Sequence, residues 1–188
     1  SGGTTSITNS GTVTKNATGN ITSTGAFSTT GDVNLAANIT TTDTNLTIGG
    51  NLVIAEAATP TLSTGAGTAG NVLVSGTTNG TTGGVAETLT VQAGTGTATF
   101  TGNVGNNANG TELEALTITN AAATTFSGTL DLANALTQTN AATGTTTFTG
   151  AVAVGSADLK GTAYALNNSF ASGGTTSITN SGTVTKNA

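Results

Sequence analysis

The chain of 188 residues contains no cysteine, methionine, tryptophan or histidine, and only one proline and one tyrosine. Without cysteine and histidine, a disulfide scaffold and a zinc site are both excluded. Arginine is also absent, so the basic residues are Lys15, Lys160 and Lys186, against eight acids and a net charge of −5. Three dispersed lysines cannot form a basic patch, and we therefore expect no nucleic-acid binding through phosphate neutralisation.

Long hydrophobic runs are missing as well, although 35% of the residues are hydrophobic and only 6% are charged. No apolar run approaches the length of a membrane-spanning helix, so we expect no transmembrane segment. The chain does not begin with methionine and shows no signal peptide. This favours a processed or excised segment. The hydrophobic fraction argues against a disordered linker.

The abundant residues are threonine, glycine, alanine and asparagine, and single large apolar residues recur between small polar ones. Alternation with a period of two is typical of β-strands that bury one face. Glycines usually precede these segments, and we expect them to supply the positive φ of tight bends between strands. The short segments predicted as strands lie at 12–14, 20–22, 26–28, 32–35, 45–48 and 71–74.

The first seventeen residues, 1–17, return unchanged as the last seventeen, 172–188. Self-similarity at a fixed period indicates a repeat array. We interpret residues 1–171 as one repeat and residues 172–188 as the start of the next identical repeat. The copies would be joined covalently in tandem or would meet end to end as separate subunits.

A shorter repeat is marked by Phe100, Phe126 and Phe148, which follow one another at similar intervals. A unit of roughly 20–27 residues matches one coil of a β-solenoid, in which each coil stacks on the last. We therefore predict an all-β fold, a parallel β-helix with about seven to nine coils per repeat, and a buried stack of these phenylalanines, joined by Phe27 and Phe170. Gln138 falls where the pattern requires an apolar residue. Three explanations stay open: a register shift, an outward side chain or a buried amide ladder.

Four longer stretches, 56–70, 76–84, 105–110 and 156–169, interrupt the alternation, and the first contains the only proline, Pro60. We interpret them as loops that project from the corners of one continuous solenoid domain.

The segments 96–104 and 144–152 share the pattern Gly-Thr-x-Thr-Phe-Thr-Gly-x-Val, and Leu-Thr-Val or Leu-Thr-Ile occurs at 89–91 and 116–118. These motifs resemble the β-strand-repeat surface proteins of bacteria, a group similar to filamentous haemagglutinin and autotransporter passenger domains. The resemblance covers most of residues 85–155. It implies a right-handed parallel β-helix and a role in adhesion, stalk or sheath formation at the cell surface.

Candidate catalytic residues are few, and we expect no enzyme activity and no catalytic, cofactor-binding or metal-binding residues. Glu112 and Glu114 are two apart, as are Asp158 and Lys160, but both pairs are typical of a solvated surface. The remaining acids are too dispersed for a calcium site built from carboxylates, which leaves a structural calcium ion held through loop carbonyls as an alternative.

These observations predict an extracellular, non-catalytic structural protein that forms a rod, filament, stalk or sheath through self-association, with lateral packing of rods as a further contact. One alternative is an adhesin that binds a glycan or a partner cell through its loops. A more remote alternative is an ice-binding face built from Thr-x-Thr elements at 12–14, 88–90, 99–101, 117–119 and 147–149.

Overall fold

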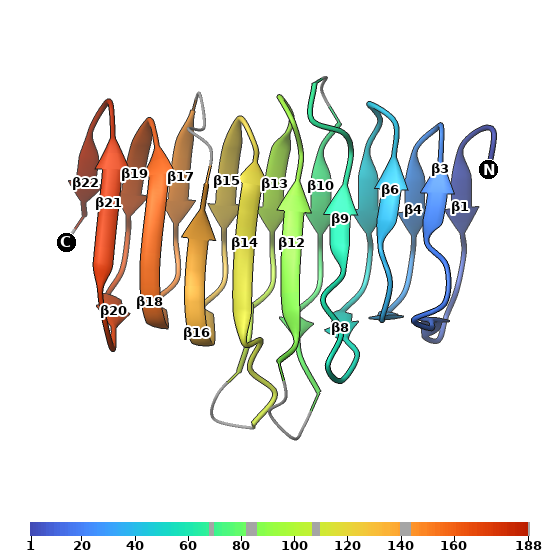
Figure 1. Cartoon of the computed structure of the whole chain (residues 1–188), viewed down its shortest axis with the longest axis horizontal. Coiled ribbons are helices and arrows are strands. Elements are labelled where there is room, and N and C mark those ends of the chain that lie inside the picture. The colour runs from blue at the N-terminus through green and yellow to red at the C-terminus, as the bar shows by residue number, and fades with distance from the viewer. Residues whose placement is uncertain (68–69, 82–85, 107–109, 140–143, 188) are drawn as a thin grey trace.

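The computed structural model describes residues 1–67, 70–81, 86–106, 110–139 and 144–187. All regular secondary structure in these residues is β-strand. The strands pair in parallel and stack along one axis, with the two termini at opposite ends of the molecule (Figure 1). This arrangement confirms the predicted all-β parallel β-solenoid. Across the described residues, no helix is present that could cross a membrane.

The first face of the solenoid is a nine-stranded sheet, in which each coil contributes one strand. Its strands are β1 (Thr5–Ile7), β4 (Phe27–Thr29), β7 (Leu46–Ile48), β10 (Val72–Val74), β13 (Thr97–Phe100), β15 (Ala123–Phe126), β17 (Thr145–Phe148), β19 (Ala163–Leu166) and β22 (Val184–Lys186). The coils differ in length, as register pairs along this face show. The coil from Thr146 to Tyr164 is the shortest, and the one from Val72 to Ala98 is among the longest.

The second face begins with the four-stranded sheet of β2 (Val13–Lys15), β5 (Val33–Leu35), β8 (Leu52–Ile54) and β11 (Thr78–Asn79). It continues through a bridge at Val104 to the first part of β16 (Leu130–Gln138), the first part of β18 (Val152–Gly161) and β20 (Phe170–Ser172).

The third face contains β3 (Ile21–Ser23), β6 (Ile39–Thr41), β9 (Thr61–Ser63), β12 (Thr88–Gln92) and β14 (Ala115–Asn120), followed by the second parts of β16 and β18 and by β21 (Thr176–Asn180). The two long strands therefore bend around the corner between the second and third faces. A register shift between Leu132 and Ala135 marks this bend in β16.

The core consists of columns of inward side chains that run along the axis. Phe100, Phe126 and Phe148 are paired in register and are at most 2% exposed, so the predicted phenylalanine stack is confirmed. The prediction that Phe27 joins this stack is wrong, because Phe27 lies in the neighbouring column of the same face, opposite Leu46. Phe170 lies on the second face and contacts the edge of the stack, with its ring centroid 5.8 Å from that of Phe148.

Asparagine and aspartate side chains connect consecutive coils at the corners. The carbonyl oxygen of Asn51 accepts a 2.9 Å hydrogen bond from the backbone N–H of Thr77, and Asn103 does the same for Thr129 at 3.0 Å. The pattern recurs at other corners: the side-chain oxygen of Asn71 accepts from the N–H of Thr97, and that of Asn38 accepts from the N–H of Thr61. In each case the acceptor belongs to the earlier coil and the donor to the later one, so the stack has a defined polarity.

The corner glycines serve a different purpose from the one predicted. Among Gly11, Gly19, Gly25, Gly31, Gly50 and Gly70, positive φ occurs only at Gly19. At Gly50, a Cβ atom would lie 2.5 Å from the carbonyl carbon of Gly31, and at Gly31 it would lie 2.8 Å from the backbone oxygen of Asn9. Close approach of the preceding coil, rather than left-handed backbone, therefore requires glycine at positions 25, 31, 50 and 70, whereas Gly11 and Gly19 have no atom of the described residues within 4 Å of a Cβ position.

The interpretation of residues 56–70, 76–84 and 156–169 as loops is wrong in part. The first stretch contains β9, directly after Pro60, whose carbonyl accepts a hydrogen bond from the N–H of Thr90. A proline before the first residue of a strand costs no ladder bond. Residues 76–84 contain β11, and residues 156–169 contain the end of β18 and all of β19. Residues 82–84 and 107–109 of the predicted loops lie outside the described residues. Residues 156–169 hold few β-branched side chains, and the pairing of β18 with β16 and of β19 with β17 makes them strands despite weak local preference.

Candidate self-association surfaces

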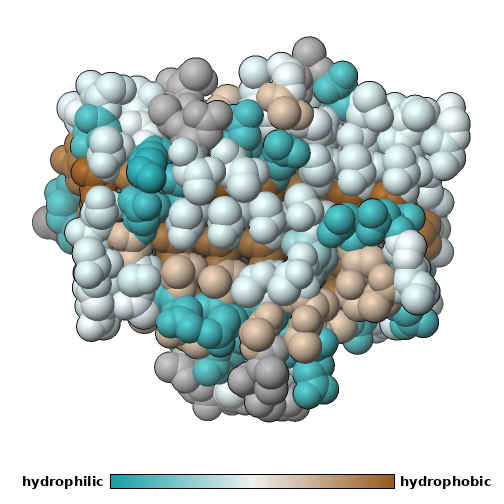
Figure 2. All heavy atoms as spheres, in the orientation of Figure 1, coloured by the Kyte–Doolittle hydropathy of each residue, from teal (hydrophilic) through white to brown (hydrophobic). Residues whose placement is uncertain are grey.

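The two ends of the solenoid present open strand edges. Among the described residues, β1, β2 and β3 pair only with the second coil, and β20, β21 and β22 pair only with the coil before them. Several inward apolar residues of these end coils are only partly buried, and Val184 is 45% exposed. Unpaired backbone groups beside uncovered apolar residues make such an edge a template for pairing with another chain. Apolar side chains, brown in Figure 2, show at the ends of the molecule and as bands along its axis.

The same seventeen residues occur at both ends, and three local hydrogen bonds are shared by the first copy (residues 1–17) and the second copy (residues 172–188), although β1 has three residues and β21 has five. Ser1 and Ser172 each donate a side-chain hydrogen bond to the carbonyl two residues later. Asn9 and Asn180 each donate from Nδ2 to the carbonyl of the glycine two residues later. Lys15 and its counterpart Lys186 donate to the next carbonyl. The segment therefore carries its own turn geometry wherever it lies.

The two copies nevertheless lie on different faces. In the first copy, β1 belongs to the first face and β2 to the second. In the second copy, the equivalent residues form β21 on the third face and β22 on the first. Seven successive parallel pairings, each one coil apart, connect Thr5 in β1 with Tyr164 in β19 along the first face. From β19 the chain passes through β20 on the second face to β21 on the third, which adds two faces. One repeat, residues 1–171, thus spans seven and two-thirds coils, within the predicted range.

The acidic residues singled out in the sequence do not come together as a catalytic or metal site. Glu114 accepts a hydrogen bond from the side-chain amide of Asn134 and is separated from Glu112 by the inward Leu113. Asp158 and Lys160 form an exposed ion pair of 3.3 Å on the third face. In the part of the chain that the structure describes, no group of three or more acids could hold a metal ion.

One buried acid was missed by sequence reasoning. Glu87 is 1% exposed and accepts a hydrogen bond from the hydroxyl of Thr81. One carboxylate oxygen of Glu112 is shielded from solvent without a hydrogen-bond partner among the described atoms, so the fully solvated interpretation of Glu112 is incomplete. No periodicity in the sequence distinguishes these two acids from the exposed ones.

A polar cluster inside the solenoid explains the unexpected glutamine. Gln138 pairs with Ile118 and Leu159 in an inward column and is 3% exposed. Its Oε1 accepts a 2.9 Å hydrogen bond from the hydroxyl of Thr146, and its Nε2 donates to the carbonyl of Lys160 at 3.0 Å. Of the three explanations for Gln138, burial of the amide is correct, but its partners are a hydroxyl and a backbone carbonyl rather than a ladder of amides.

The only tyrosine lies beside this cluster. Tyr164 is 1% exposed, and its hydroxyl has no hydrogen-bond partner among the described atoms. Burial, with a smaller contribution from the negative charge of Asp158, raises the pKa of the phenol to about 12.

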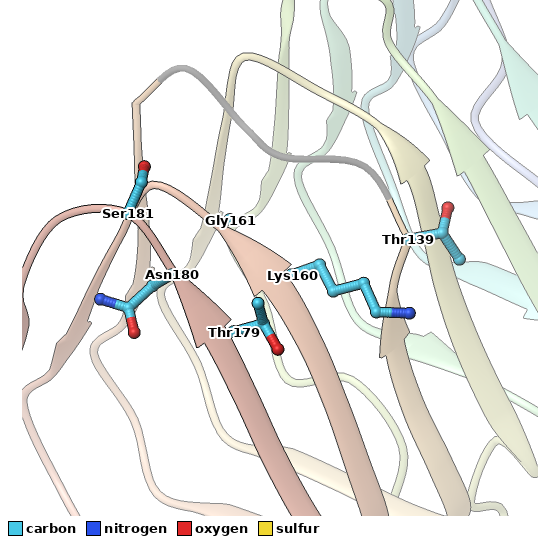
Figure 3. A pocket seen from close by; sticks show the side chains of 6 residues that line it. All are labelled: Thr139, Lys160, Gly161, Thr179, Asn180 and Ser181. Atoms are coloured by element: carbon cyan, nitrogen blue, oxygen red, sulfur yellow. The ribbon is translucent and has the colours of Figure 1, made fainter.

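A shallow hollow of about 410 Å³ lies on the third face near the C-terminal end (Figure 3). The side chain of Lys160 extends across it toward Thr139. The hollow is lined by Thr139, Lys160, Gly161, Thr179, Asn180 and Ser181. Hydroxyl, amide and ammonium groups around an open surface can hydrogen-bond a polar ligand such as a sugar, but they hold no catalytic pair.

The Thr-x-Thr elements are distributed over all three faces. Those at 99–101 and 147–149 begin on the first face, the one at 12–14 lies on the second, and those at 88–90 and 117–119 lie on the third. On the first face, the outward column that contains Thr99, Thr125 and Thr147 also contains Leu73. The elements therefore do not form one continuous plane of threonines.

Comparison with known proteins gives no relative for this chain: no protein-family model matches it, and neither a curated protein nor a solved structure matches it significantly.

Proposed function

We propose that this protein is a non-catalytic structural element of the cell exterior, which forms a rod, filament, stalk or sheath by adding copies of itself along the solenoid axis. The observation that carries this proposal is that the same seventeen residues supply two of the three edge strands at each open end. Each end leaves strand edges unpaired and apolar residues partly exposed. A further copy would extend both the hydrogen-bond ladder and the core columns without a new kind of contact.

The inventory of side chains supports a mechanical rather than a catalytic role. Histidine, arginine and cysteine are absent from the sequence, and the acids are dispersed over the described coils. Catalysis on a β-solenoid surface would require clustered acid, base or nucleophilic groups. The extracellular location rests on the resemblance of residues 85–155 to bacterial surface proteins. Lateral packing of rods is favoured by the low charge and the hydroxyl-rich faces.

The test is assembly of the purified chain. We expect rods in negative-stain micrographs and a sedimentation coefficient that rises with protein concentration. A matched pair of substitutions at Ser6 separates edge pairing from other association. The N–H of Thr5 donates to Ala26 in the second coil, so the N–H of the next residue points to the open side. Ser6→Pro removes that donor, whereas Ser6→Ala keeps it.

Ser6→Pro should shorten or abolish the rods, and Ser6→Ala should assemble like the unmodified chain. Circular dichroism of both variants checks that the solenoid itself is retained. A chain that stays monomeric at every concentration would refute the proposal, as would equal assembly of the two variants.

The hollow around Lys160 favours a second candidate, a module that binds glycans. A glycan array probed with the unmodified chain and with Lys160→Ala distinguishes the two functions. Binding that disappears in the variant would support an adhesin, and rods without glycan binding would support the structural role.

A further inference from the structure

We propose that a second copy of the chain joins the C-terminal end in one register, with its residues 1–17 in the place that residues 172–188 occupy in this structure. This inference rests on the proposed function and specifies its joint. The incoming chain lies on β18 and β19, and its own residues 172–188 are displaced by a third chain in the same way. The displaced segment and the incoming one are identical in sequence, so the incoming segment can reproduce the whole set of interactions with β18 and β19.

Residues 172–188 of this structure show the apolar contacts that the joint would make. Ile178 pairs with Leu159 on the third face, and Val184 pairs with Tyr164 on the first. The equivalent residues of an incoming chain are Ile7 and Val13. Both are only partly buried in the first coil, where nothing among the described residues covers them from below.

The backbone hydrogen bonds of the two copies are complementary. As residues 172–188, the segment bonds the coil below it: Thr175 accepts from Ala157, Thr183 accepts from Tyr164, and Gly182 donates to Thr162, at 2.7–3.0 Å. As residues 1–17, it bonds the coil above it through other groups.

In the first copy, Thr5 donates to Ala26, Val13 donates to Asp32, and Ile7 accepts from Thr30, at 2.8–3.1 Å. The two sets use different atoms of the same seventeen residues. One segment can therefore make both sets at once, with β18 and β19 of one chain below it and β4 and β5 of its own chain above it.

The next strand of the incoming chain also finds a partner. In this register β3 continues over β20, which places Ile21 above Phe170. Both side chains are packed against the core but remain partly exposed in the single chain. Each would cover the other in the joint, and so the third edge of the terminal coil is closed as well.

The geometry of the resulting rod follows from the two copies. Each added chain advances seven and two-thirds coils. At about 4.8 Å per coil, this is an axial rise of about 37 Å. The two-thirds of a coil beyond seven full coils rotates each chain by two faces relative to the chain before it. The original orientation therefore returns after three chains, an axial distance of about 110 Å. Copies of any one surface feature, such as the hollow around Lys160, would therefore point in three directions around the rod.

Cysteine pairs test the register, because the natural chain contains no cysteine. Ser177 pairs with Asp158, and Ser6 is its equivalent in the first copy. The variant Ser6→Cys with Asp158→Cys should form intermolecular disulfides between neighbouring chains, since paired strands bring Cα atoms within the range a disulfide spans. The two residues of one chain lie at opposite ends and cannot react with each other.

Two further pairs report the competing registers. Ser6→Cys with Thr185→Cys reports stacking without rotation, first face on first face. Ser6→Cys with Ala171→Cys reports a chain that simply continues the spiral beyond β22. Asp158→Cys with Ser177→Cys is the positive control within one chain.

Matched isoleucine variants test the displacement. Ile178→Ser weakens the packing of residues 172–188 on their own chain and should increase the yield of the Ser6–Asp158 cross-link several-fold. Ile7→Ser weakens the packing of the incoming residues 1–17 and should reduce that yield several-fold.

A ladder of oligomers from the Ser6–Asp158 pair, with little from the other two pairs, supports this joint. Dominance of either competing pair, or equal effects of the two isoleucine variants, overturns the register but leaves the rod. A monomer by sedimentation with every pair overturns both proposals.

Discussion

The rings of Phe126 and Phe148 lie one above the other in consecutive coils, with centroids 5.2 Å apart and planes 3° from parallel. Phe100 stacks on Phe126 in the same way, at 5.3 Å. Parallel pairing in register places identical side chains directly over one another, so a sequence period becomes a continuous column of rings. The middle ring contacts a neighbour on both sides.

Phe126→Ala should therefore lower the free energy of unfolding by about 3–5 kcal/mol, because it removes a fully buried ring and leaves a cavity in the column. Thermal or denaturant unfolding followed by circular dichroism measures the loss. The outward neighbour provides the control: Thr125→Ser should change stability by less than about 0.5 kcal/mol. An unchanged midpoint for Phe126→Ala would contradict the role of the stack.

The columns are the part of the fold that the sequence predicts best. The intervals between Phe100, Phe126 and Phe148 correspond directly to the lengths of two coils, and the neighbouring leucines at 89, 116 and 136 are also paired in register. Strand positions follow from the alternation of apolar and small polar residues. Local pattern suffices there because every coil repeats the same environment.

The face on which each copy of the repeated segment lies could not be predicted. The coils differ in length, and the phase of residues 172–188 is the accumulated result of all of them. Nothing within the seventeen residues records that phase. Burial of Glu87 was also missed: its carboxylate lies beside Gly80 and accepts a hydrogen bond from Thr81, and no alternation of apolar and polar residues marks these contacts. The corner glycines were recognised, but close contact with the neighbouring coil is invisible in a local pattern.

Two threonines in one inward column offer a matched test of the polar interior. Thr146 donates its hydroxyl proton to Gln138, whereas the buried hydroxyl of Thr124, one coil earlier, has no partner among the described atoms. Thr146→Val should cost about 1–3 kcal/mol of stability, because it leaves a buried amide oxygen without a donor. Thr124→Val keeps the shape and removes an unpaired hydroxyl, so stability should stay the same or rise by up to about 1 kcal/mol.

Denaturant midpoints of the two valine variants, measured side by side, decide this point. Equal losses would mean that the hydrogen bond to Gln138 contributes no stability of its own. The double variant Thr146→Val with Gln138→Leu replaces both partners by apolar groups and should recover part of the loss.

Gly105 combines positive φ with the closest approach between coils. Its φ is +71°, and a Cβ atom there would lie 1.8 Å from the backbone oxygen of Asp131. Gly105→Ala should cost more than about 3 kcal/mol, since backbone strain and a steric clash with the next coil add together. Gly110 has a φ of +63° but, among the described residues, no atom within 4 Å of its Cβ position, so Gly110→Ala should cost only about 1–2 kcal/mol.

Unfolding of the two alanine variants under the same conditions separates conformation from contact. The difference between them measures the close approach alone, because both substitutions place alanine at a similar positive φ. If Gly110→Ala were as damaging as Gly105→Ala, the clash with Asp131 would not be the cause.

The raised pKa of Tyr164 makes stability depend on alkaline pH. The folded chain holds the phenol protonated up to about pH 12, whereas the unfolded chain releases the proton near pH 10. Below pH 10 the phenol is neutral in both states and its contribution to stability is constant. Between about pH 10 and 12 the unfolded state alone loses the proton, so stability should fall by on the order of 2–3 kcal/mol.

Tyr164→Phe is the matched control for this alkaline loss. It removes a buried hydroxyl that has no partner among the described atoms, so the variant should be at least as stable at neutral pH and should lack that part of the loss. Because Tyr164 is the only tyrosine, its ionisation is visible without interference in the ultraviolet difference spectrum. Identical pH profiles for the two proteins between pH 10 and 12 would show that Tyr164 ionises as freely in the folded chain as in the unfolded one, and would contradict its burial inside the solenoid.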